Sequence, residues 1–202
     1  EASSTAEVLC DFLADIGATM TRGIAESLLT GIVTDTMGFR TTNVTAATLR
    51  AAADLVDAGA DIAAISLNAL HRKPLPTAKI WGAGLARMRL DDGLLWTAIP
   101  RAAFREAGIE GSPTSAGLVN FLSDVDEAVM GAVLSETEEG KVRVTMRTQP
   151  PYNVAEVATQ FGGGGHALAA GCTLDGPLDE AAAKLVAACR AAISRQASVP
   201  VT

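Results

Sequence analysis

Cysteine and histidine are scarce in this sequence, and their scarcity excludes two kinds of site. The 202 residues include only two histidines and three cysteines, Cys10, Cys172 and Cys189. The cysteines are odd in number, stand in mostly apolar surroundings and form no C-x-x-C pair. We therefore expect neither a disulfide framework nor a zinc site, and reduced thiols in a cytoplasmic protein are the simple interpretation.

Basic residues and long apolar runs are also in short supply. The 16 Lys and Arg are outnumbered by 23 Asp and Glu, which gives a net charge of -7. Proteins that wrap long double-stranded nucleic acid need extended basic surfaces, so we expect no such partner, whereas a small anion held by a few local cations is compatible. No apolar run approaches the roughly 20 residues of a membrane span, and no segment resembles a signal peptide, so we expect no membrane partner.

The apolar residues that are present suffice for a globular fold. They make up 49% of the sequence, which is enough for one large or two small domains. The sequence starts at Glu1 rather than at methionine, and Ser4 with Glu7 forms the S-x-x-E pattern of a helix start. We interpret it as a fragment of a longer protein.

The first third of the chain predicts helices and one buried strand. Helices are expected at residues 4–16, 24–29, 45–59 and 61–70, with Thr45 and Asp61 as caps. The run GIVT, residues 31–34, predicts a strand that leads into Asp35, at the end where α/β folds assemble their sites. Asp35 is therefore a candidate ligand for Mg or Mn. A strand-end aspartate also often caps the next turn, and that alternative stays open.

The segment HRKPLP, residues 71–76, predicts a linker, because two prolines within three residues disfavour both helix and central strand. We place the domain boundary between Arg72 and Pro76, which divides the chain into residues 1–73 and 74–202. His71 in this segment belongs to a solvated basic cluster and receives no role. Beyond the boundary we expect a mixed sheet, with strands at 94–99, 129–135, 141–147 and 172–174 and helices at 79–89, 101–107, 116–122, 153–160 and 178–194.

Four consecutive glycines precede His166. Each glycine raises the entropy cost of ordering the chain and contributes no side chain, so packing does not explain the run and we expect something to approach its backbone. Consecutive N–H groups can converge on an anion, and the imidazole adds a donor. A flexible surface turn is the alternative, although apolar Phe161 and the residues 167–170 on either side favour a shaped loop.

Arg147 lies at the end of the strand VRVTMRT, in which alternation places Arg143, Thr145 and Arg147 on one face. A guanidinium offers a planar fork suited to phosphate oxygens, but a strand arginine is more often a solvated residue, and both interpretations stay open. Asn120, within GLVNFL, is either a polar residue on a helix face or a base contact.

The segments ASSTAE, GIVTDTMGFR, MRT and FGGGGHALAAG resemble, in order and spacing, the DHH phosphoesterases related to RecJ. Within that superfamily the chain resembles the branch of bifunctional oligoribonucleases and phosphoadenosine-phosphate phosphatases, or nano-RNases, whose relatives also hydrolyse products of cyclic di-adenosine monophosphate. The resemblance covers essentially the whole chain, and the glycine-histidine run is its most specific motif.

The resemblance implies an α/β fold in which the end of a parallel-sheet DHH catalytic domain, residues 1–73, is joined by the linker to a smaller mixed-sheet DHH-associated domain, residues 74–202. It implies a manganese-dependent phosphoesterase acting on short nucleotides, and a homodimer. Asp35 would be the last aspartate ligand of a two-manganese centre, and Thr148 stands where relatives commonly have serine. Substrate binding would involve Arg147, Thr148, Gly162, Gly163, Gly164, Gly165 and His166, with Asn120 as a further candidate.

Two motifs of the family, D-x-D and Asp-His-His, are absent from this sequence. A two-metal centre needs several ligands around paired ions, so we expect this chain alone neither to bind manganese tightly nor to turn over substrate. The alternative function is a non-catalytic nucleic-acid-binding module of the kind found in alanyl-transfer-RNA synthetases and editing proteins, which the first 70 residues and the net charge of -7 disfavour. Pyrophosphatases and exopolyphosphatases of the superfamily lack the glycine run.

Overall fold

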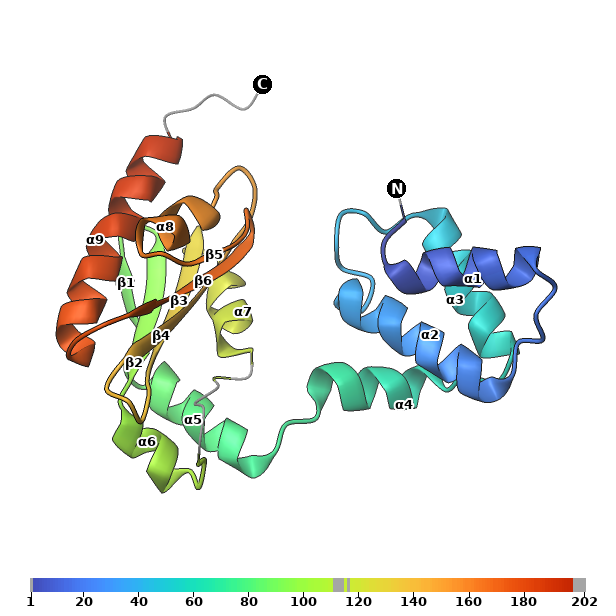
Figure 1. Cartoon of the computed structure of the whole chain (residues 1–202), viewed down its shortest axis with the longest axis horizontal. Coiled ribbons are helices and arrows are strands. Elements are labelled where there is room, and N and C mark those ends of the chain that lie inside the picture. The colour runs from blue at the N-terminus through green and yellow to red at the C-terminus, as the bar shows by residue number, and fades with distance from the viewer. Residues whose placement is uncertain (1, 111–114, 116, 198–202) are drawn as a thin grey trace. The chain divides into compact units, whose positions relative to one another are not determined.

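The computed structural model describes residues 2–110, 115 and 117–197, and the chain forms two compact units (Figure 1). Unit 1 is Glu1–Lys73 and unit 2 is Pro74–Thr202, so the division falls within the proline-containing segment HRKPLP.

Unit 1 is built from helices whose starts are fixed by side-chain caps. Ser4 Oγ accepts a hydrogen bond from Glu7 N at 3.1 Å, Thr45 and Thr48 form a capping box, and Asp61 accepts from Ala64 N. These caps confirm three of the predicted helix starts. The elements are α1 (Thr5–Asp15), α2 (Arg22–Asp35), α3 (Ala46–Asp57), α4 (Ile62–Ser66) and the π-helical turn η1 (Leu67–His71).

A buried carboxylate ties the start of α1 to the start of α3. Glu7 accepts hydrogen bonds from Ser3 N at 2.7 Å, from Ser3 Oγ at 2.6 Å and from Thr48 Oγ1 at 3.0 Å. Burial alone would raise the pKa of Glu7, but these hydrogen bonds outweigh it and hold the pKa below its ordinary value. The segment ASSTAE is therefore a helix start whose polar groups satisfy one another.

The predicted strand at residues 31–34 is wrong, because α2 continues without a break to Asp35. Ile32 and Val33 are fully buried at helical spacing from Leu28 and Leu29, so the apolar run belongs to the face of a helix. A short apolar run does not distinguish a buried strand from a buried helix, and here the helix prevails. In the described part of unit 1 the structure contains no strand.

Unit 2 contains a mixed sheet, as the sequence predicts. The strand order is β1-β2-β3-β4-β6-β5; β2 and β3 run parallel, and the other neighbouring pairs are antiparallel. The strands are β1 (Arg89–Asp91), β2 (Leu94–Ile99), β3 (Met130–Glu136), β4 (Val142–Thr148), β5 (Gly164–His166) and β6 (Ala169–Leu174).

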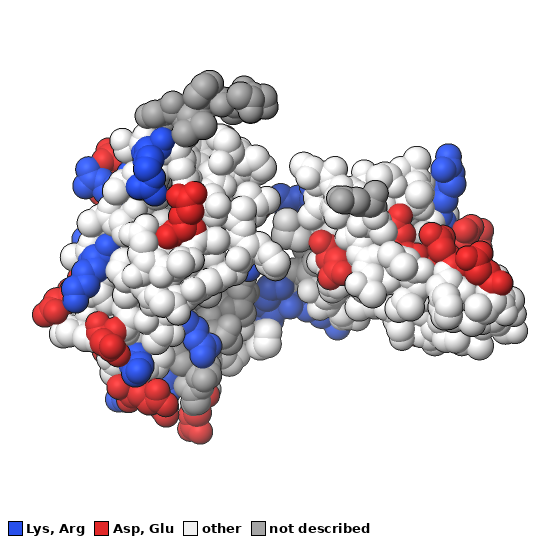
Figure 2. Space-filling model, turned by 45° about the horizontal axis from the view of Figure 1, so that its top comes forward, with Lys and Arg blue, Asp and Glu red and all other residues white. Residues whose placement is uncertain are grey.

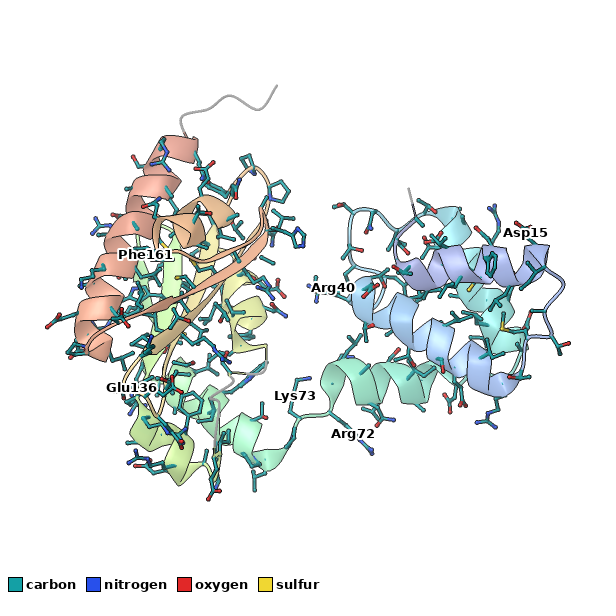
Figure 3. The ribbon with its side chains drawn as sticks, in the orientation of Figure 1. Asp15, Arg40, Arg72, Lys73, Glu136 and Phe161 are labelled. Atoms are coloured by element: carbon teal, nitrogen blue, oxygen red, sulfur yellow. The ribbon has the colours of Figure 1, made fainter. Side chains whose placement is uncertain are left out.

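Helices cover both faces of this sheet. Residues of α8 (Ala155–Gln160) and α9 (Leu178–Ala197) pack with Leu94, Met130, Val144 and Met146 on one face, which we call the α9 face, and Phe161 packs against the same core (Figure 3). Residues of α5 (Leu75–Leu85), α6 (Arg101–Glu106) and α7 (Leu118–Ser123) pack with Leu95, Ile99 and Val133 on the other, the α7 face. No helix of the described residues has the length and apolarity that a membrane span requires.

The observed elements differ from the predicted ones at several points. Helix α5 begins at Leu75 rather than at residue 79, because Pro74 precedes the helix and Pro76 occupies its first turn, where a missing N–H costs nothing. Strands β1 and β5, three residues each, were not predicted from the sequence. Residue 116, where a helix was expected to begin, lies outside the described residues.

Candidate functional site

Strand β4 divides its side chains between the core and the α7 face. Val142, Val144, Met146 and Thr148 are buried, whereas Arg143 is exposed and Thr145 and Arg147 are half-buried. Because β4 lies between β3 and β6, both of its edges are paired and its register is fixed from two sides. The alternation predicted from the sequence is confirmed.

Sheet register brings Arg147 and His166 to the same face of unit 2. Arg147 on β4 is directly opposite Ala169 on β6, and Ala169 is directly opposite His166 on β5. Directly opposite residues point to the same face, and strands lie about 4.8 Å apart, so the Cα atoms of Arg147 and His166 are about 10 Å apart. We call these three residues the Arg147 row. Its two polar side chains flank the small Ala169, which leaves room for an anion between them.

Arg147 is half-buried and held in place by its own strand. One guanidinium nitrogen, Nη1, donates a hydrogen bond to the carbonyl of Met146 at 2.9 Å. Burial lowers the pKa of Arg147 from its ordinary value, because the charged form has lost solvent. No carboxylate of the described residues forms an ion pair with it. An anion bound at this position would supply the missing countercharge.

Asn120 lies on the helix that borders the Arg147 row. Helix α7 packs closely on β3 at Gly131, where an added Cβ would lie 2.9 Å from Ser123 N and 3.1 Å from Val119 O. Gly131 is directly opposite Arg147, so α7 lies beside the row at its β3 end. Asn120 is half-buried within α7.

Packing explains two of the four glycines and backbone conformation explains a third, contrary to the sequence-based expectation. Gly162, with φ +71°, follows the end of α8, where its N–H donates to Thr159 O. A Cβ on Gly163 would lie 2.2 Å from Gly171 O, and a Cβ on Gly165 would lie 2.5 Å from Ala169 O, so both must be glycine for β5 to approach β6. Gly164 has open space where a Cβ would be, as Gly162 does, but its φ is not positive.

The open side of Gly164 lies next to the Arg147 row. Gly164 is two residues before His166 in β5, and alternation places both on the same face of the strand. Both are exposed. A ligand can therefore approach the backbone at Gly164 while it contacts the imidazole.

Thr148 does not join this face. It is buried, and its Oγ1 donates a hydrogen bond to Val129 O at 2.6 Å. As the neighbour of Arg147 in an extended strand, it points to the opposite side of the sheet. Its hydroxyl thus serves the packing of β4 beside the start of β3.

Asp35, the candidate metal ligand, is the last residue of α2 and is exposed. The chain then passes through three consecutive left-handed residues, Met37, Gly38 and Phe39, with φ of 48°, 72° and 66°. Left-handed backbone is unfavourable for residues other than glycine and tends to cluster at functional sites. Asp35 therefore stands immediately before a strained turn of defined shape.

Thr36 holds this turn in place, which the sequence did not indicate. It is fully buried, its Oγ1 donates to Ile32 O at 2.6 Å and accepts from Phe39 N at 3.0 Å. The only available signal was the repeat of threonine on both sides of Asp35 in TDT. The first of these threonines, Thr34, bonds back to the carbonyl of Thr30 within α2.

The described residues do not by themselves fit a manganese ion. No group of three or more His, Cys, Asp or Glu side chains is gathered among them. Hard divalent ions take about six oxygen ligands, of which protein carboxylates usually supply several, and Asp35 contributes one.

Comparison with known proteins relates this geometry to a family. A model of the DHHA1 domain matches residues 104–195. The chain is 35% identical to a bifunctional oligoribonuclease and PAP phosphatase, NrnA, of Thermus thermophilus over 196 residues, which are 96% of this chain and 58% of the relative. It is 27% identical to a probable enzyme of the same name from Streptococcus mutans over 172 residues, 85% of this chain and 54% of the relative.

A solved structure shares the fold. The crystal structure of an exopolyphosphatase-related protein from Bacteroides fragilis superimposes with a TM-score of 0.89 at 20% identity, and the match covers 98% of this chain and 59% of that one. The chain therefore spans little more than half the length of these relatives.

Proposed function

The chain belongs to the DHH-type phosphoesterases, with a DHHA1 domain at residues 104–195, and from this premise we propose that it supplies substrate binding to an enzyme that hydrolyses phosphate esters of short nucleotides. The proposed substrates are short oligoribonucleotides, 3'-phosphoadenosine 5'-phosphate and linear or cyclic di-adenosine monophosphate. The names of the two curated relatives, oligoribonuclease and PAP phosphatase, support the first two of these.

The Arg147 row is the observation that carries the proposal. Its guanidinium is partly desolvated and lacks an acidic partner in the described residues, and phosphate oxygens are suited to its planar fork. His166 adds a second donor from β5, and Gly164 leaves space for the body of the ligand. Two cationic or polar groups flanking a flat, open stretch suit a compact phosphorylated molecule.

The distribution of charge supports a short ligand rather than a long nucleic acid. Figure 2 shows basic and acidic residues interspersed over unit 2, and acidic residues gathered at one end of unit 1. Together with the net charge of -7, this provides little electrostatic attraction for a long duplex. Manganese enters the proposal as the metal of the family, with Asp35 as its candidate ligand. Hydrolysis by this chain alone is not expected.

The test is calorimetric titration of the whole chain with a 5'-phosphorylated two-nucleotide adenylate, with and without manganese. Arg147→Ala and His166→Ala each remove one donor, and a charge-assisted hydrogen bond contributes about 1.5–3 kcal/mol. We therefore expect affinity to fall roughly 10- to 100-fold in each variant. Arg105→Ala removes the same charge from an exposed site on α6 and is the matched control, with affinity expected to stay unchanged.

Three results would contradict the proposal. The first is metal-independent binding that survives both Arg147→Ala and His166→Ala, and the second is no binding of the adenylate under any condition. The third is tight, salt-sensitive binding of transfer RNA in place of the dinucleotide, which would favour the alternative of a nucleic-acid-binding module.

A further inference from the structure

The polar surface of β4 continues beyond the Arg147 row. Two residues before Arg147, Thr145 is directly opposite Gly171 on β6, which is in turn opposite Gly164 on β5. Two residues further, Arg143 is directly opposite Thr173. Alternation places all of these on the α7 face, so a line of polar side chains runs from Arg147 to Arg143 along one strand.

Small residues line the surface between Arg147 and Arg143. Beside Thr145 and Arg147, the neighbouring positions on β6 are Gly171 and Ala169, and the next strand contributes Gly164. A Cβ on Gly171 would lie 2.7 Å from Val144 O, so this position cannot hold a larger side chain. An extended ligand that leaves the Arg147 row meets no bulky group on these strands before it reaches Arg143.

Four basic residues of unit 2 form ion pairs within the described part of the chain, and Arg143 is not among them. Lys141 pairs with Asp175 at 3.5 Å and Arg195 with Glu156 at 3.2 Å, and Arg101 and Arg190 form ion pairs with Glu138 and Asp92. Arg143 is exposed and has neither an ion pair nor a hydrogen bond from its side chain in the described part of the chain. Its charge is available to an anion.

The distance between the arginines sets the size of ligand that reaches both. Four residues of a strand span about 13 Å. Phosphates of a helical strand advance about 3.4 Å per nucleotide, so this distance corresponds to roughly four nucleotides, and to fewer in an extended strand. A dinucleotide anchored at Arg147 stays short of Arg143, whereas a pentanucleotide reaches it.

We propose that Arg143, with the hydroxyl of Thr173 beside it, is a second phosphate subsite that makes binding depend on oligonucleotide length. The proposal rests on the proposed function, because it takes the Arg147 row as the first subsite. It assigns to Arg143 a role in substrate selection, since an additional phosphate contact is available to oligonucleotides and not to a mononucleotide or dinucleotide.

The experiment compares 5'-phosphorylated oligoadenylates of two and five nucleotides, titrated into the whole chain by fluorescence anisotropy. We expect the wild type to bind the pentanucleotide roughly tenfold more tightly, the effect of one charge-assisted contact. Arg143→Ala should remove this preference and leave dinucleotide affinity unchanged, and Arg143→Lys should restore most of it. Arg105→Ala, the control, should behave as the wild type.

Salt dependence gives a second readout that a purely structural role would not change. Each phosphate contact to a single strand contributes about 0.7 to the slope of log affinity against log salt concentration. For the pentanucleotide, Arg143→Ala should lower this slope by about that amount, and Arg143→Lys should preserve it.

The outcomes separate the two proposals. Equal pentanucleotide affinity in Arg143→Ala and wild type overturns the second subsite and leaves the proposed function intact. An equal loss for both lengths also overturns it, because it places Arg143 in the first subsite. If the wild type binds neither oligonucleotide, the proposed function itself fails.

Discussion

Replacing Gly163 by alanine is expected to destabilise unit 2, whereas the same change one residue later is not. The Cβ added at Gly163 would lie 2.2 Å from Gly171 O, 2.5 Å from Cys172 Cβ and 2.7 Å from Cys172 Cα. Two of these three atoms belong to the backbone of β6, which cannot turn aside as a long side chain can. Strands β5 and β6 would have to separate.

The size of the effect follows from this separation. Moving the oxygen of Gly171 out to an ordinary contact of 3.4 Å requires a shift of more than 1 Å. A shift of this size breaks the backbone hydrogen bonds between β5 and β6 near that oxygen. One or two lost backbone hydrogen bonds cost about 1 kcal/mol each, and overpacking costs about 1–3 kcal/mol. The sum is about 2–5 kcal/mol, or a fall of roughly 10–20 °C in the unfolding midpoint of unit 2.

Gly164→Ala is the matched variant in the same motif. Its Cβ meets nothing within 4 Å, so thermal stability should stay within about 1 kcal/mol of the wild type. The methyl group projects into the space that a ligand would occupy, and affinity for the two-nucleotide adenylate should fall about tenfold. Gly82→Ala, which adds a methyl group to open space on α5, controls for the substitution itself and should leave affinity unchanged.

The assay is thermal and urea denaturation followed by circular dichroism, paired with calorimetric titration of the adenylate. Unchanged stability in Gly163→Ala would refute the close approach of β5 to β6. A Gly164→Ala variant that is less stable than Gly163→Ala would refute the division of the motif into packing and ligand-facing positions.

Three further predictions concern unit 1 and the thiols. Thr36→Val should cost unit 1 about 1–3 kcal/mol in urea denaturation, because the bonds to Ile32 O and from Phe39 N are lost; an unchanged midpoint would contradict this. Burial raises the pKa of Cys172 to about 11 and that of Cys189 to about 12, and it also raises the pKa of Cys10, which is less buried. Iodoacetamide at pH 8 should therefore modify Cys10 first, and mass spectrometry would identify the modified residue. The lowered pKa of Glu7 means that its stabilisation is present above about pH 4.5 and is lost as pH falls; Glu7→Gln should flatten this acid limb, and an identical pH profile would count against it.

Local signals predicted the parts of the fold that depend on neighbouring residues. The caps at Ser4, Thr45 and Asp61 act over three residues of chain, and each is seen in the structure. Strand β2, Leu94–Ile99, coincides with its prediction, because Gly93 and Pro100 bound its short apolar run on either side. The run at 31–34 is compatible with a strand or a helix, and only the packing of Ile32 and Val33 with Leu28 and Leu29 decides between them.

Pairing between distant segments could not be predicted from the sequence. Strand β5 exists because Gly163 and Gly165 let it approach β6, and no alternation in the sequence reveals such a strand. The same holds for the candidate site. Arg147 and His166 were singled out separately, and only the register of β4, β6 and β5 places them in one row. Thr148 follows Arg147 in the chain, yet the pleat directs it into the core.

The position of β4 between two fixed neighbours also limits how this protein can vary in length. A shift of β4 by one residue would turn Arg143 and Arg147 into the core and expose Val144 and Met146. Because β4 is paired with both β3 and β6, the strand could not return to its register by moving alone. Single insertions or deletions within residues 142–148 should therefore abolish both folding and binding. The β3–β4 connection, where Thr137 and Lys141 already close a polar turn, can accept added residues without moving either arginine.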